Sequence, residues 1–239
     1  MLSKSQIKLI TSLKQKKYRQ KHGFFVVEGV KTITELLHSN LELYKLYTTT
    51  SFNFNAKDEV VVSEQELKRI SFLTTPNAAL AIFKIPKPES INASGLIVAL
   101  DAVRDPGNLG TIIRLCDWFG IKELVCSKET VDCFNPKVVQ ATMGSITRVN
   151  INYVDLVPFL KTSNLPVYGA FMDGENVYKS KLPQNGILVM GNEANGVSIE
   201  VEGIITEKIS IPRFGTLQAT ESLNVATATA ILLSEFRRK

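Results

Sequence analysis

An asparagine and an arginine lie where an apolar run gives way to a glycine-containing turn and a helical pattern. The stretch RDPGNLGTIIRLCDWFG (104–120) follows GLIVAL and contains Asn108 and Arg114. Its glycines do not have the G-x-G-x-x-G spacing of a dinucleotide site. An arginine one turn after Gly110 suits a phosphate or a planar substrate group. The alternative is an arginine on a solvated helix face, paired with Asp117.

A second glycine-containing turn, GNEANGVS (191–198), follows the apolar run GILVM. It resembles the G-x-x-x-x-G-K-[ST] phosphate loop, but Val197 takes the lysine position, which argues against a nucleotide hydrolase. The loop keeps one acid, Glu193, and glycines that let a backbone approach a ligand closely. The alternative is a turn with a capping carboxylate.

The third stretch, 209–236, contains a strand ending at Pro212, a loop and a C-terminal helix opened by Ser222, Leu223 and Asn224. We expect Ser222 to cap this helix and Asn224 to point from its first turn toward the loops. An ordinary amphipathic helix is the alternative, but it explains the polar start poorly.

The elements that must position these residues alternate between strand and helix after residue 95. Apolar, β-branched strands are expected at 95–100, 123–127, 147–154, 166–171, 186–191 and 208–212. Helices are expected near 107–119, 135–143, 155–163, 197–202 and 222–237. This alternation predicts an α/β domain with a mostly parallel sheet covered on both faces. Ligands bind such sheets beyond the carboxyl ends of the strands, where the three polar stretches begin.

The N-terminal part has shorter elements: a helix over 3–20 capped by Ser3 or Ser5, a strand at 23–29 and a helix at 30–39. A stretch rich in Pro, Ser and Asn ends it. We therefore predict a small domain at 1–88, a linker at 89–94 and a second domain at 95–239.

Composition is ordinary for a globular protein, with 44% hydrophobic and 21% charged residues. No apolar run approaches the roughly 20 residues that span a bilayer, and the charged N-terminus lacks the apolar region of a secretory signal. Three cysteines and two histidines give no zinc pattern and no disulfide framework. These features favour a cytoplasmic protein without a metal or a membrane partner.

Positive charge is concentrated in the N-terminal part. Residues 1–90 carry 14 basic and 8 acidic side chains, residues 91–239 carry 14 and 15, and residues 1–21 carry seven basic and no acidic ones. Such an excess suits the phosphate backbone of a nucleic acid, although a solvated basic helix explains it equally well. The candidate RNA-binding residues are Lys14, Lys16, Lys17, Arg19 and Lys21.

Together, the three polar stretches resemble the three motifs of the SpoU (TrmH-type) RNA ribose 2′-O-methyltransferases, over about 95–239. Residues 17–37 also resemble the small L30e-like RNA-binding domain that precedes many of these catalytic domains. The resemblance implies a SPOUT fold with a deep C-terminal trefoil knot, a homodimer with its site near the interface, and S-adenosylmethionine as the cofactor. It places the cofactor contacts at Gly191, Ile211 and Leu223.

The same resemblance implies a catalytic set of Arg114, Asn108, Glu193, Ser222 and Asn224. It proposes Arg114 as a general base, but a guanidinium rarely loses its proton. We favour a clamp for the phosphate and the 2′-hydroxyl.

The sequence departs from the family pattern twice. Arg213 replaces the methionine of the third motif, and the loop from Gly215 to Ser222 is longer than usual.

We expect ribosomal RNA, most of all 23S rRNA, as the substrate, transfer RNA as the second choice, and a non-catalytic RNA-binding protein as the alternative class. Trp118 and Phe119 are expected in the core or at an interface.

Overall fold

The structure is a computed structural model and describes residues 2–52, 58–216 and 222–238. The chain folds into two compact units. The first unit is Met1–Lys87 with Asp132–Thr147, and the second is Pro88–Val131 with Arg148–Lys239. The segment Asp132–Thr147 therefore groups with the first unit although it lies within 95–239. The expected boundary at 89–94 stays a prediction.

The first unit is a four-stranded sheet with helices on both faces. Its elements are α1 (Lys4–Ser12), α2 (Lys16–His22), β1 (Phe24–Glu28), α3 (Val30–Leu37), β2 (Leu43–Thr48), β3 (Glu59–Val61), α4 (Glu64–Ile70), β4 (Ala79–Lys84), α6 (Pro136–Thr142) and the 3-10 turn η1 (Ser145–Thr147). The strand order is β1-β4-β2-β3, with β4 antiparallel to both neighbours and β3 parallel to β2.

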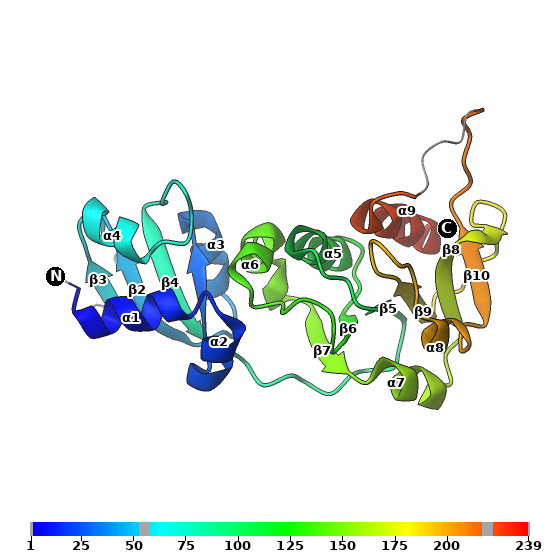
Figure 1. The fold of residues 1–239 in the computed structure, drawn as a ribbon, viewed down its shortest axis with the longest axis horizontal. Coiled ribbons are helices and arrows are strands. Elements are labelled where there is room, and N and C mark those ends of the chain that lie inside the picture. The colour runs from blue at the N-terminus through cyan, green and yellow to red at the C-terminus, as the bar shows by residue number, and fades with distance from the viewer. Residues whose placement is uncertain (1, 53–57, 217–221, 239) are drawn as a thin grey trace. The chain divides into compact units, whose positions relative to one another are not determined.

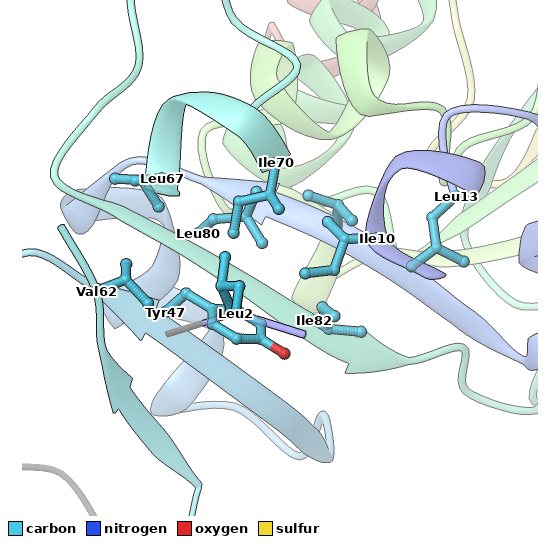
Figure 2. Close-up of a cluster of buried hydrophobic side chains, with 10 residues drawn as sticks. Leu2, Ile10, Leu13, Tyr47, Val62, Leu67, Ile70, Leu80 and Ile82 are labelled. Atoms are coloured by element: carbon cyan, nitrogen blue, oxygen red, sulfur yellow. The ribbon is translucent and has the colours of Figure 1, made fainter. Parts of the chain in front are cut away.

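A hydrophobic cluster fills the space between this sheet and helices α1 and α4. Figure 2 shows Ile10 and Ile70 between Leu67 on one side and Leu13 on the other, and all four belong to this cluster. On the other face, Phe25 packs on Phe83 of β4 and on Phe134, which precedes α6. Both faces of the small sheet are therefore buried, and segment 132–147 supplies part of one cover.

The predicted single helix over 3–20 is wrong, because the chain forms two helices there. Ser3 caps α1 in a capping box with Gln6, α1 ends at Ser12, and α2 starts at Lys16. The guanidinium of Arg19 fills the break by donating to the carbonyls of Leu13 (2.8 Å) and Lys14 (3.0 Å). These carbonyls lack the partners that a continuous helix would provide.

The second unit is a six-stranded sheet in which every neighbouring pair is parallel. Its elements are β5 (Leu96–Leu100), α5 (Pro106–Trp118), β6 (Glu123–Ser127), β7 (Asn150–Val154), α7 (Leu156–Thr162), β8 (Val167–Asn176), β9 (Gly186–Met190), α8 (Ile199–Glu202), β10 (Glu207–Ser210) and α9 (Val225–Arg237). The strand order is β10-β8-β9-β5-β6-β7.

Helices cover this sheet in two pairs, α5 with α9 and α7 with α8 (Figure 1). One core joins Leu156, Leu160 and Val201 to the strands β5, β6, β8 and β9. In the other layer, Phe236 of α9 meets Tyr168 of β8 edge-on. The predicted α/β architecture with a parallel sheet is confirmed, and β8 runs five residues beyond its expected end at 171.

Cys116, Cys126 and Cys133 are free and buried. Burial raises the pKa of the Cys116 thiol, so this side chain stays protonated and behaves as a small apolar group. Within the described ranges, no helix has the length and apolar character needed to cross a membrane. The same residues hold no group of three or more His, Cys, Asp or Glu side chains suited to a metal ion.

Candidate active site

The carboxyl ends of β5 and β9 form the point of the large sheet where the strand connections diverge. The two strands pair as far as Leu100 and Met190, and the Asp101 N–H donates to the Met190 carbonyl at 2.9 Å. From β5 the chain continues toward β6 on one side, and from β9 it continues toward β10 on the other. Such a switch point is the usual ligand site of an open parallel sheet.

Helix α5 begins at Pro106, one residue before the expected start near 107. Asp105 is its N-cap and accepts from the Asn108 N–H at 2.8 Å. Proline at the first helical position fits, because its missing N–H would have no partner inside the helix. Asn108 therefore lies in the first turn of α5, beside the end of β5.

The loop after β9 folds back tightly on itself. Asn192 and Gly196 exchange backbone hydrogen bonds of 2.8 and 2.9 Å. A Cβ at Gly191 would lie 2.3–2.6 Å from the backbone of Gly196 and Val197, so only glycine fits there. The amide of Asn192 holds the turn by donating to the Ala102 carbonyl at 2.6 Å.

Glu193 joins this loop to the start of α5. Its carboxylate accepts from the N–H groups of Arg104 (3.2 Å) and Asp105 (3.1 Å) and from the Asn108 amide (3.1 Å). Partial burial alone would raise the pKa of Glu193, but these hydrogen bonds to the charged form outweigh it and lower the pKa. Glu193 is therefore an ionised acceptor at neutral pH.

Asn224, Asn108 and Glu193 form a chain of side-chain hydrogen bonds, here called the amide relay. Asn224 Oδ1 accepts from the N–H groups of Ala226 (3.0 Å) and Thr227 (3.2 Å). Asn224 Nδ2 donates to Asn108 Oδ1 at 2.9 Å, and Asn108 Nδ2 donates to Glu193. Because backbone donors stand at one end and a carboxylate at the other, both amides have one allowed orientation.

The prediction that Ser222 caps the last helix is wrong. Asn224, not Ser222, caps α9, and the helix starts at Val225. Asparagine is as good a cap as serine, and its amide can also reach Asn108. Ser222 is exposed and lines the neighbouring pocket. Residues 217–221 of the longer loop lie outside the described residues.

A pocket of about 970 Å³ lies beside the amide relay. Its lining includes the three expected cofactor contacts, Gly191, Ile211 and Leu223. Glu193 and Asn224 also line it, together with apolar side chains of β9 and α9. A pocket of this size and mixed lining suits a small organic molecule.

Arg114 is exposed on α5 and does not line the pocket. Within the described part of the chain, its guanidinium makes no hydrogen bond or ion pair. The pairing with Asp117 considered from the sequence is not formed, because Arg148 Nε binds the Asp117 carboxylate at 2.9 Å. Trp118, one turn after Arg114, is 84% exposed, which excludes the core and leaves the interface as the expected position that stays a prediction.

The candidate RNA-binding residues divide into two groups. Lys14, Lys16, Lys17 and Lys21 are exposed. Arg19 is only 2% exposed, and its Nε and Nη2 donate to Asp132 Oδ2 at 3.0 and 2.5 Å. The assignment of Arg19 to RNA binding is therefore corrected, because its donors are used inside the first unit.

Sequence reasoning missed three side chains that hold the site. Asp105 caps α5, Asn192 closes the β9 loop, and Asp101 accepts from the Ser198 N–H at 2.7 Å. An aspartate before a proline is a readable helix start and could have identified Asp105. The other two roles depend on contacts between residues 90 and 97 positions apart, which no local pattern reveals.

Comparison with known proteins places this geometry in a family. Residues 95–234 match the SpoU rRNA Methylase family, and residues 4–81 match the MRM3-like substrate binding domain. The 23S rRNA (guanosine(2553)-2′-O)-methyltransferase RlmP of Bacillus subtilis is 31% identical over 235 residues, which cover 94% of this chain and 93% of that protein.

Two solved structures match nearly the whole chain. A protein from Porphyromonas gingivalis assigned to the TrmH family of RNA methyltransferases is 40% identical, with a TM-score of 0.87 and coverage of 99% and 98% of the two chains. An AdoMet-bound rRNA methyltransferase from Sinorhizobium meliloti is 30% identical, with a TM-score of 0.88 and coverage of 99% and 96%. The chain therefore belongs to the SpoU rRNA methylase family and carries the substrate binding domain of MRM3-like proteins ahead of it.

Proposed function

We propose that this protein transfers a methyl group from S-adenosylmethionine to a ribose 2′-hydroxyl of structured RNA, most of all 23S rRNA. The observation that carries the proposal is the amide relay, which lies beside a pocket lined by a tight loop in which only glycine fits at position 191. A purely structural turn does not need two oriented amides and an ionised carboxylate at the edge of a cavity.

The pocket fits the cofactor of this family. Its volume of about 970 Å³ and its apolar lining from Met190, Ile211, Leu223 and Leu232 suit the adenosine and the aliphatic parts of the molecule. Glycine at 191 lets the loop fold back against its own backbone at Gly196 and Val197, and this tight loop forms part of the pocket lining. When bound, S-adenosylmethionine supplies a methyl group on a positively charged sulfur.

The residues of the chain then orient the attacking hydroxyl. Glu193 fixes Asn108, and α9 fixes Asn224, so each amide keeps one N–H that the relay does not use. These N–H groups lie beside the pocket and can position the oxygen atoms of a ribose. Holding a nucleophile in line contributes up to roughly 7–11 kcal/mol to such a reaction.

Arg114 acts as a clamp for the RNA phosphate, and it does so across a homodimer. Two observations support this proposal: Arg114 is exposed yet absent from the lining of its own pocket, and the 84% exposed Trp118 lies one turn away on the same helix face. A second copy docked on this face would cover Trp118 and bring its Arg114 to the pocket.

Structured ribosomal RNA is favoured over transfer RNA because relatives matched over nearly their full length carry rRNA names. The exposed lysines Lys14, Lys16, Lys17 and Lys21 supply affinity for the phosphate backbone. The cytoplasmic location and a trefoil knot around the C-terminal loops belong to the same proposal.

The test is methyl transfer from labelled S-adenosylmethionine to RNA from a strain lacking the gene. Ribose methylation is mapped separately in ribosomal and transfer RNA by resistance to alkali. We expect label in 23S rRNA with the wild-type protein, labelling about 10²–10³-fold slower with Arg114→Ala, and normal label with Lys161→Ala, a matched charge removal on α7. Label in transfer RNA alone would overturn the substrate. Cofactor binding without label in any RNA would favour a non-catalytic RNA-binding protein.

Mixed dimers test the position of Arg114. Arg114→Ala and Gly191→Val are each expected to be inactive, the second because its side chain collides with the backbone at Gly196. If the clamp comes from the second copy, dimers of the two variants contain one complete site and regain activity. Activity that stays at background in a verified mixed dimer would contradict the arrangement.

A further inference from the structure

Two aromatic side chains lie exposed beside the pocket without a role in the amide relay. Phe214 is 84% exposed, and Tyr178 is 38% exposed. Their ring centroids are 6.4 Å apart, with an angle of 34° between the ring planes. We call this pair the aromatic platform. Aromatic side chains are normally buried, and this pair keeps much of its surface in water.

The aromatic platform belongs to the same edge of the large sheet as the amide relay. Tyr178 follows the end of β8, and Phe214 follows the end of β10, where the Val177 N–H donates to the Ser210 carbonyl at 2.9 Å. Asn176 Oδ1 accepts from the Tyr178 N–H at 3.0 Å, which fixes the backbone of the turn. The platform is therefore attached to strand ends.

The platform is also continuous with the pocket. Phe214 lies between Arg213 and Gly215, which both line the pocket. Two further lining side chains, Met172 and Leu223, are 53% and 46% exposed. Exposed apolar side chains thus lie both in the lining of the pocket and at Phe214, whose two chain neighbours are lining residues.

We propose that the aromatic platform stacks an unpaired base of the RNA substrate, next to the ribose that is methylated. RNA is recognised most often through unstacked bases that lie against aromatic rings. We infer that the occupant is RNA because arginines flank the rings. Arg213 adjoins Phe214, and the Arg238 guanidinium, which also pairs with Glu235 at 2.9 Å, donates to the Tyr178 carbonyl at 3.5 Å. A strand with a base on the rings would bring phosphates near these cations.

This inference rests on the proposed function and adds a binding subsite to it. The site it assigns contains no catalytic residue, so Phe214 and Tyr178 act on binding of RNA and not on the chemical step. The inference also gives a role to the sequence IPRF (211–214), which departs from the usual I-P-M of the third motif. Its last two residues would lie on the RNA side of the pocket.

Binding of RNA without cofactor tests the platform directly. The probes are a 23S rRNA transcript and a single-stranded oligouridine of about 12 nucleotides, a length within the range that one binding module covers. Stacking on an aromatic ring is worth about 1–3 kcal/mol per base, so Phe214→Ala should raise Kd about 5- to 150-fold. Tyr178→Ala should act in the same direction. Phe214→Tyr should keep the wild-type value.

Three controls decide whether the effect is stacking. Ile199→Ala removes another exposed apolar side chain, 85% exposed on α8, and should leave Kd unchanged. An RNA duplex of the same length should bind all variants equally, because its bases are already stacked. The Kd for S-adenosylmethionine and the oligomeric state of Phe214→Ala should match those of the wild type.

Several results would overturn the platform. Unchanged RNA affinity in Phe214→Ala would do so, and so would full affinity in Phe214→Leu, which keeps an apolar surface without a ring. A change of oligomeric state in Phe214→Ala would assign the rings to a subunit contact instead. A wild-type protein that binds RNA in a Phe214-dependent way but transfers no methyl group would contradict the proposed function and leave the platform standing.

Discussion

Arg19 in the first unit and Arg114 in the second are both helical arginines with opposite environments. Arg19 is 2% exposed and uses its guanidinium on Asp132 and on two backbone carbonyls. Arg114 is exposed and, among the described residues, its guanidinium binds none of them. One arginine holds a fold together, whereas the other remains available for a ligand.

The polar groups of the two units differ in the same way. In the first unit, Glu28 is 6% exposed and accepts from Ser71 and Phe72, so its bonds join β1 to the end of α4. In the second unit, the amide relay is partly exposed and borders a pocket. In the first unit, the hydrogen bonds of Glu28 satisfy a buried carboxylate and join two elements of the fold. In the second unit, the hydrogen bonds of the amide relay orient partly exposed side chains beside the pocket. Substitutions in the first unit should change stability, and those at the relay should change activity.

The largest effect is expected from Arg19→Ala. Removal of one partner leaves the Asp132 carboxylate without its cation, which typically destabilises a protein by about 3–5 kcal/mol. Hydrogen exchange of β1 and β4 should accelerate accordingly. Lys17→Ala on the same helix removes an exposed charge and should leave exchange unchanged. Arg19→Met with Asp132→Leu should recover much of the loss. Unchanged exchange in Arg19→Ala would remove the contrast between the two arginines.

Arg114→Ala should give the reverse pattern. Loss of a group that stabilises charge in a transition state typically lowers kcat by about 10²–10³-fold, or roughly 3–4 kcal/mol. Unfolding free energy should stay within about 0.5 kcal/mol, as for other surface positions. Single-turnover rates and urea unfolding measure the two quantities. A destabilised protein with normal turnover would show that Arg114 is structural and not part of the catalytic site.

Glu193→Gln should have an intermediate effect. The amide oxygen can still accept from Asp105 and Asn108, but the amide nitrogen would then face the Arg104 N–H, where two donors oppose each other. Loss of a hydrogen bond to a charged group costs about 1.5–3 kcal/mol, so we expect activity to fall about 10- to 100-fold. Glu193→Asp keeps the charge but shortens the side chain, so its activity shows whether the loss comes from the missing charge or from the hydrogen-bond distance.

The lowered pKa of Glu193 also predicts how the stability of the fold and the reaction rate depend on pH. A carboxyl group whose pKa is lower in the folded state stabilises the fold fully above its unfolded pKa, near 4.3, and this contribution is lost as pH falls through the lower, folded value. Between about pH 5.5 and 8, Glu193 should therefore contribute no ionisation to the rate profile. A kinetic ionisation in that range that disappears in Glu193→Gln would contradict an ionised acceptor.

The sequence predicted much of the second unit because its signals are local. Strands such as LIVAL and GILVM are continuous apolar runs, as expected for strands buried on both faces, and the polar turns follow them directly. Arg19 shows where such signals fail. Its basic neighbours indicated a solvated helix, but its partner Asp132 lies 113 residues away. The same limit explains Trp118, whose exposure depends on which helix face the rest of the unit covers.

The smallest effects are expected from the exposed lysines of the first unit. If Lys16, Lys17 and Lys21 contact RNA phosphates, each change to Gln should weaken binding to all RNA sequences alike. The slope of log K against log salt should fall by about 0.7–0.9 per lysine removed. Lys68→Gln on α4 removes an exposed charge of the same unit and serves as the matched control. Equal slopes for all four variants would mean that charge on α2 only solvates the helix, and that RNA is bound chiefly by the second unit.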